Sequence, residues 1–145
     1  MNFGFMLPSR GPLTRPECLS LIAKRGEELG YGFIMFPDHI VMPRNLSSQY
    51  PYSPSGVFPG TDNNETMEQL TTLAFLAGQT SSIRLVTSVM VVPHRSPVLT
   101  AKVLSTLDVL SRGRITVGVG TGWLEEEFQA LEPHPFAERG AVTDE

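Results

Sequence analysis

Apolar residues along this chain follow two alternating patterns. Short, nearly continuous apolar runs, typical of strands in a parallel sheet, alternate with stretches in which apolar residues recur every three or four positions, as on one face of a helix. The runs predict strands over residues 2–6, 31–36, 83–92 and 114–119. The periodic stretches predict helices over residues 14–29, 66–77 and 97–110, and the start of a fourth near residue 123. This strict alternation predicts a parallel sheet with right-handed crossovers.

Hydroxyl, acidic and glycine residues mark the ends of the predicted helices. Residues 14–17 (Thr-Arg-Pro-Glu) and 66–69 (Thr-Met-Glu-Gln) have the spacing of a capping box, in which the two side chains bind free backbone N–H groups. Gly30 and Gly113 follow the first and third helices, where the left-handed position after a helix favours glycine. These signals predict where the helices begin and end.

Residues 41–64 differ from the rest of the chain. They hold four of the twelve prolines, with serine, asparagine and glycine between them. This composition predicts a long irregular loop between the second strand and the second helix. Because such a loop is longer than an ordinary connection, we expect it to be functional.

Four strand–helix units are compatible with two architectures, a small doubly wound sheet or the first half of an eight-stranded barrel. A typical barrel has about 250 residues, so 145 residues correspond to roughly half of one. Half a barrel has open edges at its first and last strands. We therefore expect an α/β protein of the (β/α)₈ TIM-barrel type with about the first four βα units present, residues 1–145 forming the N-terminal half of one domain in a truncated or partial chain.

Composition and charge narrow the range of partners. The net charge is −4, and neither the acidic final twenty-one residues nor the nearly neutral remainder has the basic stripe of a nucleic-acid binder. No apolar run approaches the roughly 18 residues of a membrane span. The single Cys18 cannot form an internal disulfide, which favours a cytoplasmic location. We expect a small-molecule substrate, no nucleic-acid or membrane partner, and possible homo-oligomers.

Polar or small residues follow three consecutive predicted strands. Asp38 and His39 come directly after the second strand, residues 87–89 lie in the outer part of the third, and residues 120–122 follow the fourth. In parallel α/β proteins, ligands bind at the carboxyl ends of strands. Near neutral pH, His39 can donate or accept a proton, and Asp38 could orient it. Alternatively, Asp38 caps the turn and His39 is a packing residue.

Other recognised patterns give weaker signals. The glycine run at residues 118–122 lacks the dinucleotide-binding pattern, because Trp123 stands where its last glycine is needed. His39, His94 and His134 are dispersed without metal-ligand spacing, so no metal site is expected.

Two charged segments also have simple interpretations. His94 and Arg95 precede the third helix and could bind an anion there, although a solvated loop is the simpler interpretation. Residues 125–127 (Glu-Glu-Glu) are most simply a solvated first turn of the fourth helix.

Taken together, several stretches resemble the N-terminal half of bacterial luciferase-like oxidoreductases, a family of flavin- or deazaflavin-dependent barrels. They are residues 29–39, 83–89, 97–114, 117–123 and 136–145. The resemblance implies a barrel that holds an isoalloxazine-like ring at its C-terminal mouth.

The resemblance also implies roles for particular residues. His39 matches a histidine near the reactive face of the ring and is the expected catalytic residue. The Ser88–Val89 bond matches a non-prolyl cis peptide that supports the ring. Expected cofactor-binding residues are Asp38, Ser88, Val89, Thr121 and Gly122. Trp123 occupies the position of a catalytic glutamate in some deazaflavin dehydrogenases, so their chemistry is not carried over.

The implied function is hydride transfer or monooxygenation of a small organic substrate by a luciferase-like oxidoreductase. Coenzyme F420, a deazaflavin, is the first choice of cofactor, because the overall pattern resembles actinobacterial members of that branch. FMN is the second choice. The two predict different reactions, since a carbon at ring position 5 disfavours oxygen activation.

Two other functions stay open at this point. The chain could be a non-catalytic half-barrel or interaction module that lacks the complete cofactor site. It could also be a metal-dependent hydrolase that uses Asp38, His39 and His94.

Overall fold

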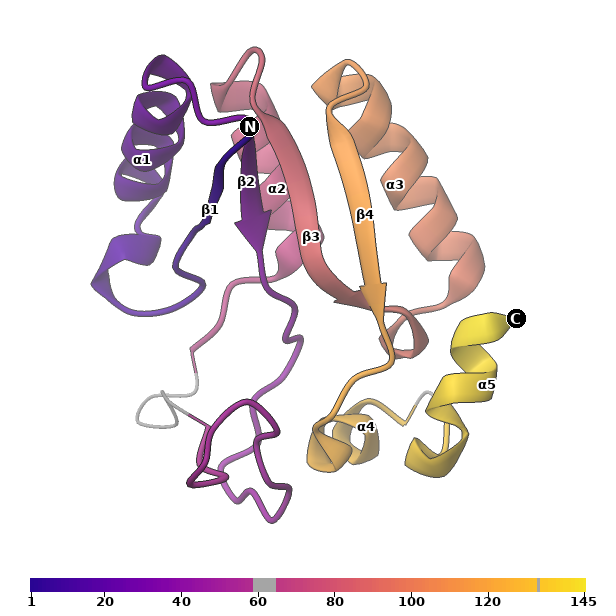
Figure 1. Ribbon diagram of the computed structural model, residues 1–145. Coiled ribbons are helices and arrows are strands. Elements are labelled where there is room, and N and C mark those ends of the chain that lie inside the picture. Colours follow the sequence, from indigo (N-terminus) through magenta and orange to yellow (C-terminus); the bar gives the residue numbers. More distant parts are fainter. Residues whose placement is uncertain (59–64, 133) are drawn as a thin grey trace.

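The computed structural model describes residues 1–58, 65–132 and 134–145 (Figure 1). Its strands are β1 (Gly4–Met6), β2 (Phe33–Phe36), β3 (Arg84–Val91) and β4 (Ile115–Gly120). Its α-helices are α1 (Pro16–Glu28), α2 (Gln69–Gln79), α3 (Pro97–Ser111), α4 (Glu125–Leu131) and α5 (Arg139–Asp144). Three short 3₁₀ turns are η1 (Pro12–Thr14), η2 (Val92–His94) and η3 (Phe136–Glu138). The predicted alternation of strands and helices is confirmed.

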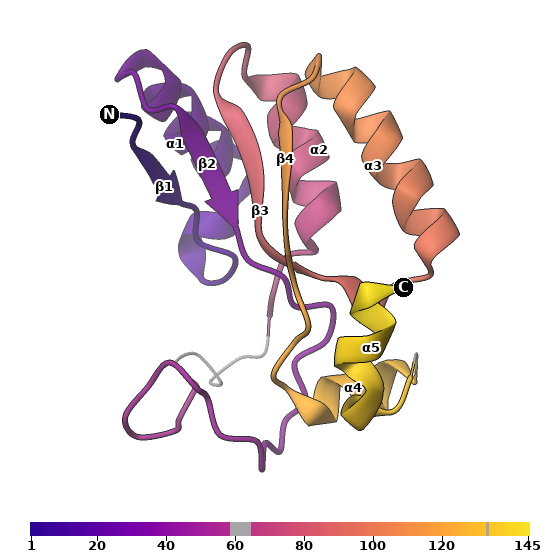
Figure 2. The ribbon, with the colours of Figure 1, turned by 45° about the vertical axis from the view of Figure 1, so that its right-hand side comes forward.

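The four strands form one parallel sheet in the order β1-β2-β3-β4. Helices α1, α2 and α3 all lie on the same face of this sheet (Figure 2). A doubly wound sheet would have helices on both faces and a reversal in strand order. Of the two predicted architectures, the structure therefore has four βα units of the barrel type.

The hydrophobic core lies between the sheet and the three helices. Ile34 and Leu85 pair across β2 and β3, and both are fully buried. The alternate row, in which Met35 pairs with Val86, faces away from the helices and is only half-buried. The continuous apolar run of β2 is therefore fully buried on the helix side and half-buried on the other, because these helices cover one face only.

Both predicted capping boxes are wrong. Helix α1 begins at Pro16, whose missing N–H suits the first helical position, and the Thr14 hydroxyl donates to the Gly11 carbonyl inside η1 instead. Helix α2 is capped by the Glu68 carboxylate, which accepts from the Thr71 N–H at 2.7 Å. The glycine signals are confirmed, since Gly30 and Gly113 have φ of 80° and 76° after α1 and α3.

A buried arginine holds the loop at the amino end of β4. Arg114 is 8% exposed, and its guanidinium donates to the Thr80 hydroxyl at 2.8 Å. It also donates to the backbone carbonyls of Ala77, Thr80, Ile83 and Ser111. These bonds join the ends of α2 and α3 to the starts of β3 and β4.

A glutamate from α1 holds the neighbouring turn. The Glu27 carboxylate accepts from the backbone N–H groups of Ser81, Ser82 and Ile83. Burial would raise the pKa of Glu27, but these hydrogen bonds outweigh it and lower the pKa to about 2. The carboxylate is therefore ionised at neutral pH.

In the described part of the chain, no helix combines the length and apolar character that crossing a membrane requires.

Candidate active site

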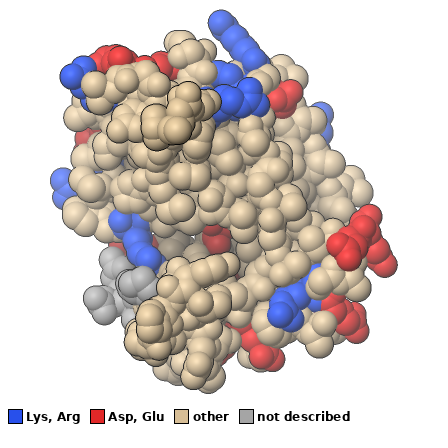
Figure 3. All heavy atoms as spheres, in the orientation of Figure 1, with Lys and Arg blue, Asp and Glu red and all other residues tan. Residues whose placement is uncertain are grey.

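A cavity of about 910 Å³ opens at the carboxyl ends of the strands. Figure 3 shows this face hollowed between the sheet and the segment that follows β2, with acidic side-chain atoms at the bottom of the hollow. The cavity size lies in the range of small-molecule sites. All six predicted site residues line it: Asp38, His39, Ser88, Val89, Thr121 and Gly122.

His39 follows β2 and is held by a residue from α4. Its Nδ1 atom lies 2.9 Å from Oε2 of Glu127, across 88 positions of sequence. Its ring packs edge-on against Phe58 and Trp123, with centroids 5.3 and 6.3 Å away. These contacts fix the imidazole at the cavity wall.

Glu127 is a functional candidate that the sequence did not single out. Its side chain is 1% exposed, and its Oε1 atom accepts from the N–H groups of Ile40 and Val41 at 2.7 and 3.1 Å. Burial would raise the pKa of this carboxyl, but the bonds from His39 and the backbone outweigh burial and lower the pKa. Glu127 is therefore an anion beside His39.

The predicted solvated turn at residues 125–127 is correct only for Glu125, which is exposed. The Glu126 carboxylate accepts from the N–H groups of Ser47 and Ser48. Glu127 lies between Leu124 and Phe128, both buried, on the inner side of α4. Leu124, Glu127 and Phe128 stand at positions i, i+3 and i+4 of the helical pattern. This spacing is the sequence signal that could have placed Glu127 on the buried face.

Asp38 does not orient His39. Its carboxylate forms a two-pronged ion pair with Arg95, with both distances 2.7 Å, and also accepts from the Val91 N–H at 2.8 Å. Arg95 pairs in turn with the α2 cap Glu68 at 2.8 Å. This cluster joins the ends of β2 and β3 to the start of α2.

Residues 94–95 form neither of the two features expected from the sequence, an anion site or a solvated loop. Arg95 binds two carboxylates of its own chain, so its charge is already compensated. His94 is 7% exposed and so does not lie in a solvated loop. Its ring packs against Phe128, and neither ring nitrogen has a hydrogen-bond partner among the described residues. Burial lowers its pKa and outweighs the opposite effect of the negative charges of Glu127 and Asp38. It is therefore neutral at neutral pH.

One wall of the cavity is apolar and open. Val89 and Val119 are 45% and 55% exposed there, and Met6 from β1 is 54% exposed. The Ser88–Val89 peptide is cis, as the family resemblance implies. A Cβ at Gly120 would lie 2.6 Å from Cγ2 of Val89, so this close approach requires glycine.

Another wall is aromatic and comes from the segment between β2 and α2 together with Trp123 from the β4–α4 connection. Its described part, residues 37–58 and 65–68, has no helix or strand, and residues 59–64 of the predicted loop lie outside the described residues. The rings of Tyr50, Phe58 and Trp123 pack with centroids 5.0–5.5 Å apart. Arg10 from the β1–α1 connection lies 4.6 Å above the Phe58 ring. The segment thus packs over the cavity.

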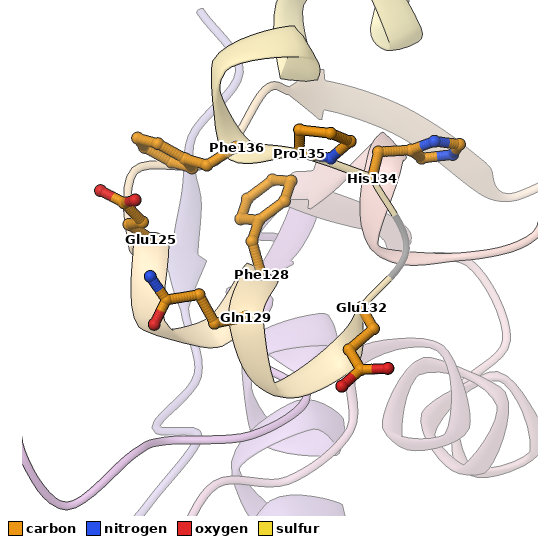
Figure 4. Close-up of a pocket in the computed structure, with 7 residues that line it drawn as sticks. All are labelled: Glu125, Phe128, Gln129, Glu132, His134, Pro135 and Phe136. Carbon is orange, nitrogen blue, oxygen red and sulfur yellow. The ribbon is translucent and has the colours of Figure 1, made fainter.

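A second hollow of about 390 Å³ lies between α4 and η3 (Figure 4). It is lined by Glu125, Phe128, Gln129, Glu132, His134, Pro135 and Phe136. None of the predicted site residues borders it, so it is separate from the candidate site. Across residues 1–58, 65–132 and 134–145, no three His, Cys, Asp or Glu side chains gather in an arrangement that could hold a metal ion.

Comparison with known proteins identifies relatives that match part or most of the chain. An uncharacterized protein of Mycobacterium tuberculosis is 35% identical over 124 residues, which are 86% of this chain and 43% of that protein. The FMNH(2)-dependent dimethylsulfone monooxygenase of Pseudomonas fluorescens is 39% identical over 59 residues, 41% of this chain and 16% of that enzyme. The chain thus spans less than half the length of these relatives.

Two solved structures share the fold. Monooxygenase RslO1 from Streptomyces bottropensis superposes with a TM-score of 0.72 at 27% identity, covering 99% of this chain and 40% of that one. The coenzyme F420-dependent tetrahydromethanopterin reductase of Methanopyrus kandleri gives a TM-score of 0.62 at 23% identity, covering 90% and 30%. The pattern of the luciferase-like monooxygenase family matches residues 1–145. With that match over every residue, and with a barrel-type sheet that carries a cavity at its carboxyl end, the chain belongs to the luciferase-like monooxygenase family.

Proposed function

We propose that this chain forms the ring-binding and proton-transferring part of a luciferase-like oxidoreductase that acts on a small organic molecule with reduced coenzyme F420 or FMN. The observation that carries the proposal is that one cavity brings together His39, the Ser88–Val89 bulge and Thr121–Gly122 from three different βα units. Only the barrel-type order of the strands makes these segments neighbours.

The apolar wall fits a flat ring system. Val89, Val119 and Met6 expose apolar surface inside the cavity, and covering such surface is favourable by about 25 cal/mol per Å². Thr121 and Gly122 border the same wall and could bind the polar edge of a ring. When bound, the flavin or deazaflavin supplies the hydride or oxygen chemistry.

The protein's part of the reaction is positioning and proton transfer. His39 lies at the cavity wall, and an imidazole is the side chain best suited to give or take a proton near neutral pH. The aromatic wall of Tyr50, Phe58 and Trp123 keeps water away from that side. Asp38 also lines the cavity, and its carboxylate is held there by Arg95.

Parallel titrations of the full-length protein with F420 and with FMN, followed by ring fluorescence, test the proposal. F420 is our first choice, and the F420-dependent reductase that shares this fold supports it. FMN is supported by the FMNH(2)-dependent relative. The cofactor that binds decides between hydride transfer and monooxygenation.

A matched pair of variants locates the binding. Val89→Asp places a charge on the apolar wall and should raise the dissociation constant of the cofactor at least about tenfold. Val98→Asp, on the outer surface of α3, should leave binding unchanged, since Val98 is exposed and borders neither cavity. If neither cofactor binds the full-length protein, or if both variants weaken binding equally, the proposal is wrong and a non-catalytic half-barrel module becomes the better interpretation.

A further inference from the structure

We propose that Glu127 is a positioning residue that holds His39 with its proton on Nδ1 and thereby makes Nε2 the atom that transfers protons in the cavity. The inference rests on the proposed function of His39 and adds to it the residue and the ring atom responsible. It is carried by the 2.9 Å contact between Nδ1 and Glu127 Oε2 and by the complete burial of that carboxylate.

An ionised carboxylate accepts hydrogen bonds and cannot donate them. Since Oε2 of Glu127 faces Nδ1, the neutral imidazole must keep its proton on Nδ1 to form this bond, and the lone pair then lies on Nε2. As a base, Nε2 takes a proton from the substrate, and the imidazolium that results is stabilised by the adjacent anion. As an acid, the imidazolium gives the same proton back from Nε2.

Glu127 is itself held in place from the opposite side. Its Oε1 atom accepts from the Ile40 and Val41 N–H groups, which directly follow His39 in the chain. One side chain on α4 therefore fixes both the ring of His39 and the backbone that carries it. This double attachment leaves the imidazole little freedom to turn away from Glu127.

The other charged groups near His39 do not compete for Nδ1. Asp38 is bound by Arg95 and the Val91 N–H, and Glu68 is bound by Arg95 and the Thr71 N–H. His94 feels the charge of Glu127 but is neutral, and its ring nitrogens form no hydrogen bond within the described part of the chain. Among the described residues, Glu127 is thus the anion that acts directly on His39.

Glu127→Gln is the decisive variant. The glutamine oxygen can still accept from Ile40 and Val41, but its amide N–H₂ then faces Nδ1 and can only donate. The neutral imidazole of His39 should therefore move its proton to Nε2. Nitrogen-15 NMR of the labelled full-length protein without cofactor should show Nδ1 as the protonated nitrogen in the wild type and Nε2 in the variant.

Turnover provides the second readout. With the proton on the wrong nitrogen, kcat should fall on the order of 10²-fold. Loss of the adjacent anion destabilises the imidazolium, so the limb of the kcat–pH profile that reports His39 should move to lower pH: the acidic limb for a base, the alkaline limb for an acid. In a His39→Ala background, Glu127→Gln should cause no further loss of kcat, because Glu127 acts through His39. An independent loss there would mean a purely structural role and would overturn the proposal.

Glu125→Gln is the matched control. It removes the same charge from the same turn of α4, but Glu125 is exposed and borders the other hollow, so the His39 spectrum and kcat should not change. Because the NMR measurement needs no cofactor, it separates this inference from the proposed function. A wild-type spectrum with the proton on Nε2 would contradict the inference, even if the Gln variant does not fold. Failure of the protein to bind F420 or FMN would contradict the proposed function but not the tautomer assignment.

Discussion

The two ends of the sheet use charged residues in different ways. At the amino end, Arg114 and Glu27 bind backbone and hydroxyl groups of their own chain, joining helix ends to strand starts. At the carboxyl end, Asp38 and Arg95 form an ion pair with each other, but His39 and its Glu127 partner lie beside an open apolar wall. In barrels of this type, stability is concentrated at one end and chemistry at the other.

The difference teaches where a ligand can find unused binding capacity. A guanidinium whose donors all have partners, as in Arg114, offers nothing to a ligand. The cavity end instead exposes apolar surface of Val89 and Val119 beside His39, and this surface is available to a ligand. Substitutions at the amino end should therefore change the free energy of unfolding, whereas substitutions at the carboxyl end should change kcat or ligand binding.

His39→Ala should give the largest effect. Loss of proton transfer is expected to lower kcat of the full-length enzyme by roughly 10²- to 10⁴-fold, while the cofactor dissociation constant changes little. Steady-state kinetics and a fluorescence titration measure the two quantities. His134→Ala, an exposed histidine beside the second hollow, is the control. Unchanged kcat would remove His39 from catalysis.

Arg114→Gln should give the next largest effect, on stability. It leaves several buried carbonyl groups without a donor, each costing about 1–3 kcal/mol, so we expect the free energy of unfolding to fall by about 3–5 kcal/mol. Denaturant unfolding measures this loss. Arg112→Gln removes a neighbouring exposed arginine and should change the free energy of unfolding by less than about 0.5 kcal/mol. Equal losses in both variants would contradict a special role for Arg114.

Glu27→Gln should give the smallest effect and a distinctive pH dependence. Because folding lowers the pKa of Glu27 from 4.5 to about 2, its ionised form stabilises the fold above pH 4.5, and this contribution is lost as the pH falls toward 2. The variant should be less stable by about 1–2 kcal/mol at pH 7 and should approach the wild type at low pH.

Unfolding curves at several pH values measure this dependence. Glu28→Gln on the same helix is the control, since Glu28 forms only an exposed pair with Arg25 that contributes little. A stability difference for Glu27→Gln that persists unchanged at low pH would show that the carboxylate charge is not the cause.

The sequence predicts the fold well because local patterns determine it. Each strand pairs with the strand of the next βα unit, so the element order is enough to bring residues 38–39, 88–89 and 121–122 to one rim. The helix starts are less predictable. Thr14 has the right spacing for a cap, but Pro16 begins the helix and the hydroxyl binds Gly11 instead.

The partners of the site residues could not be predicted from local spacing. Glu127 reaches His39 across 88 positions, and Arg95 reaches Asp38 across 57. Asp38 and His39 are neighbours in sequence but bind different partners, since successive side chains on an extended segment point in opposite directions. Such pairings depend on where α4 and η2 pack, which is a property of the tertiary structure.

The attachment of residues 40–48 to α4 has a consequence for the opening motions of the protein. Glu126 and Glu127 accept from four amides of this segment, those of Ile40, Val41, Ser47 and Ser48. If these bonds break together when α4 moves, we expect the four amides to exchange at a common rate set by one cooperative local opening. The rim of the cavity and the fourth βα unit would in that case open and close as a single unit, and the lifetime of that unit would limit how fast a ligand sealed beneath it could leave.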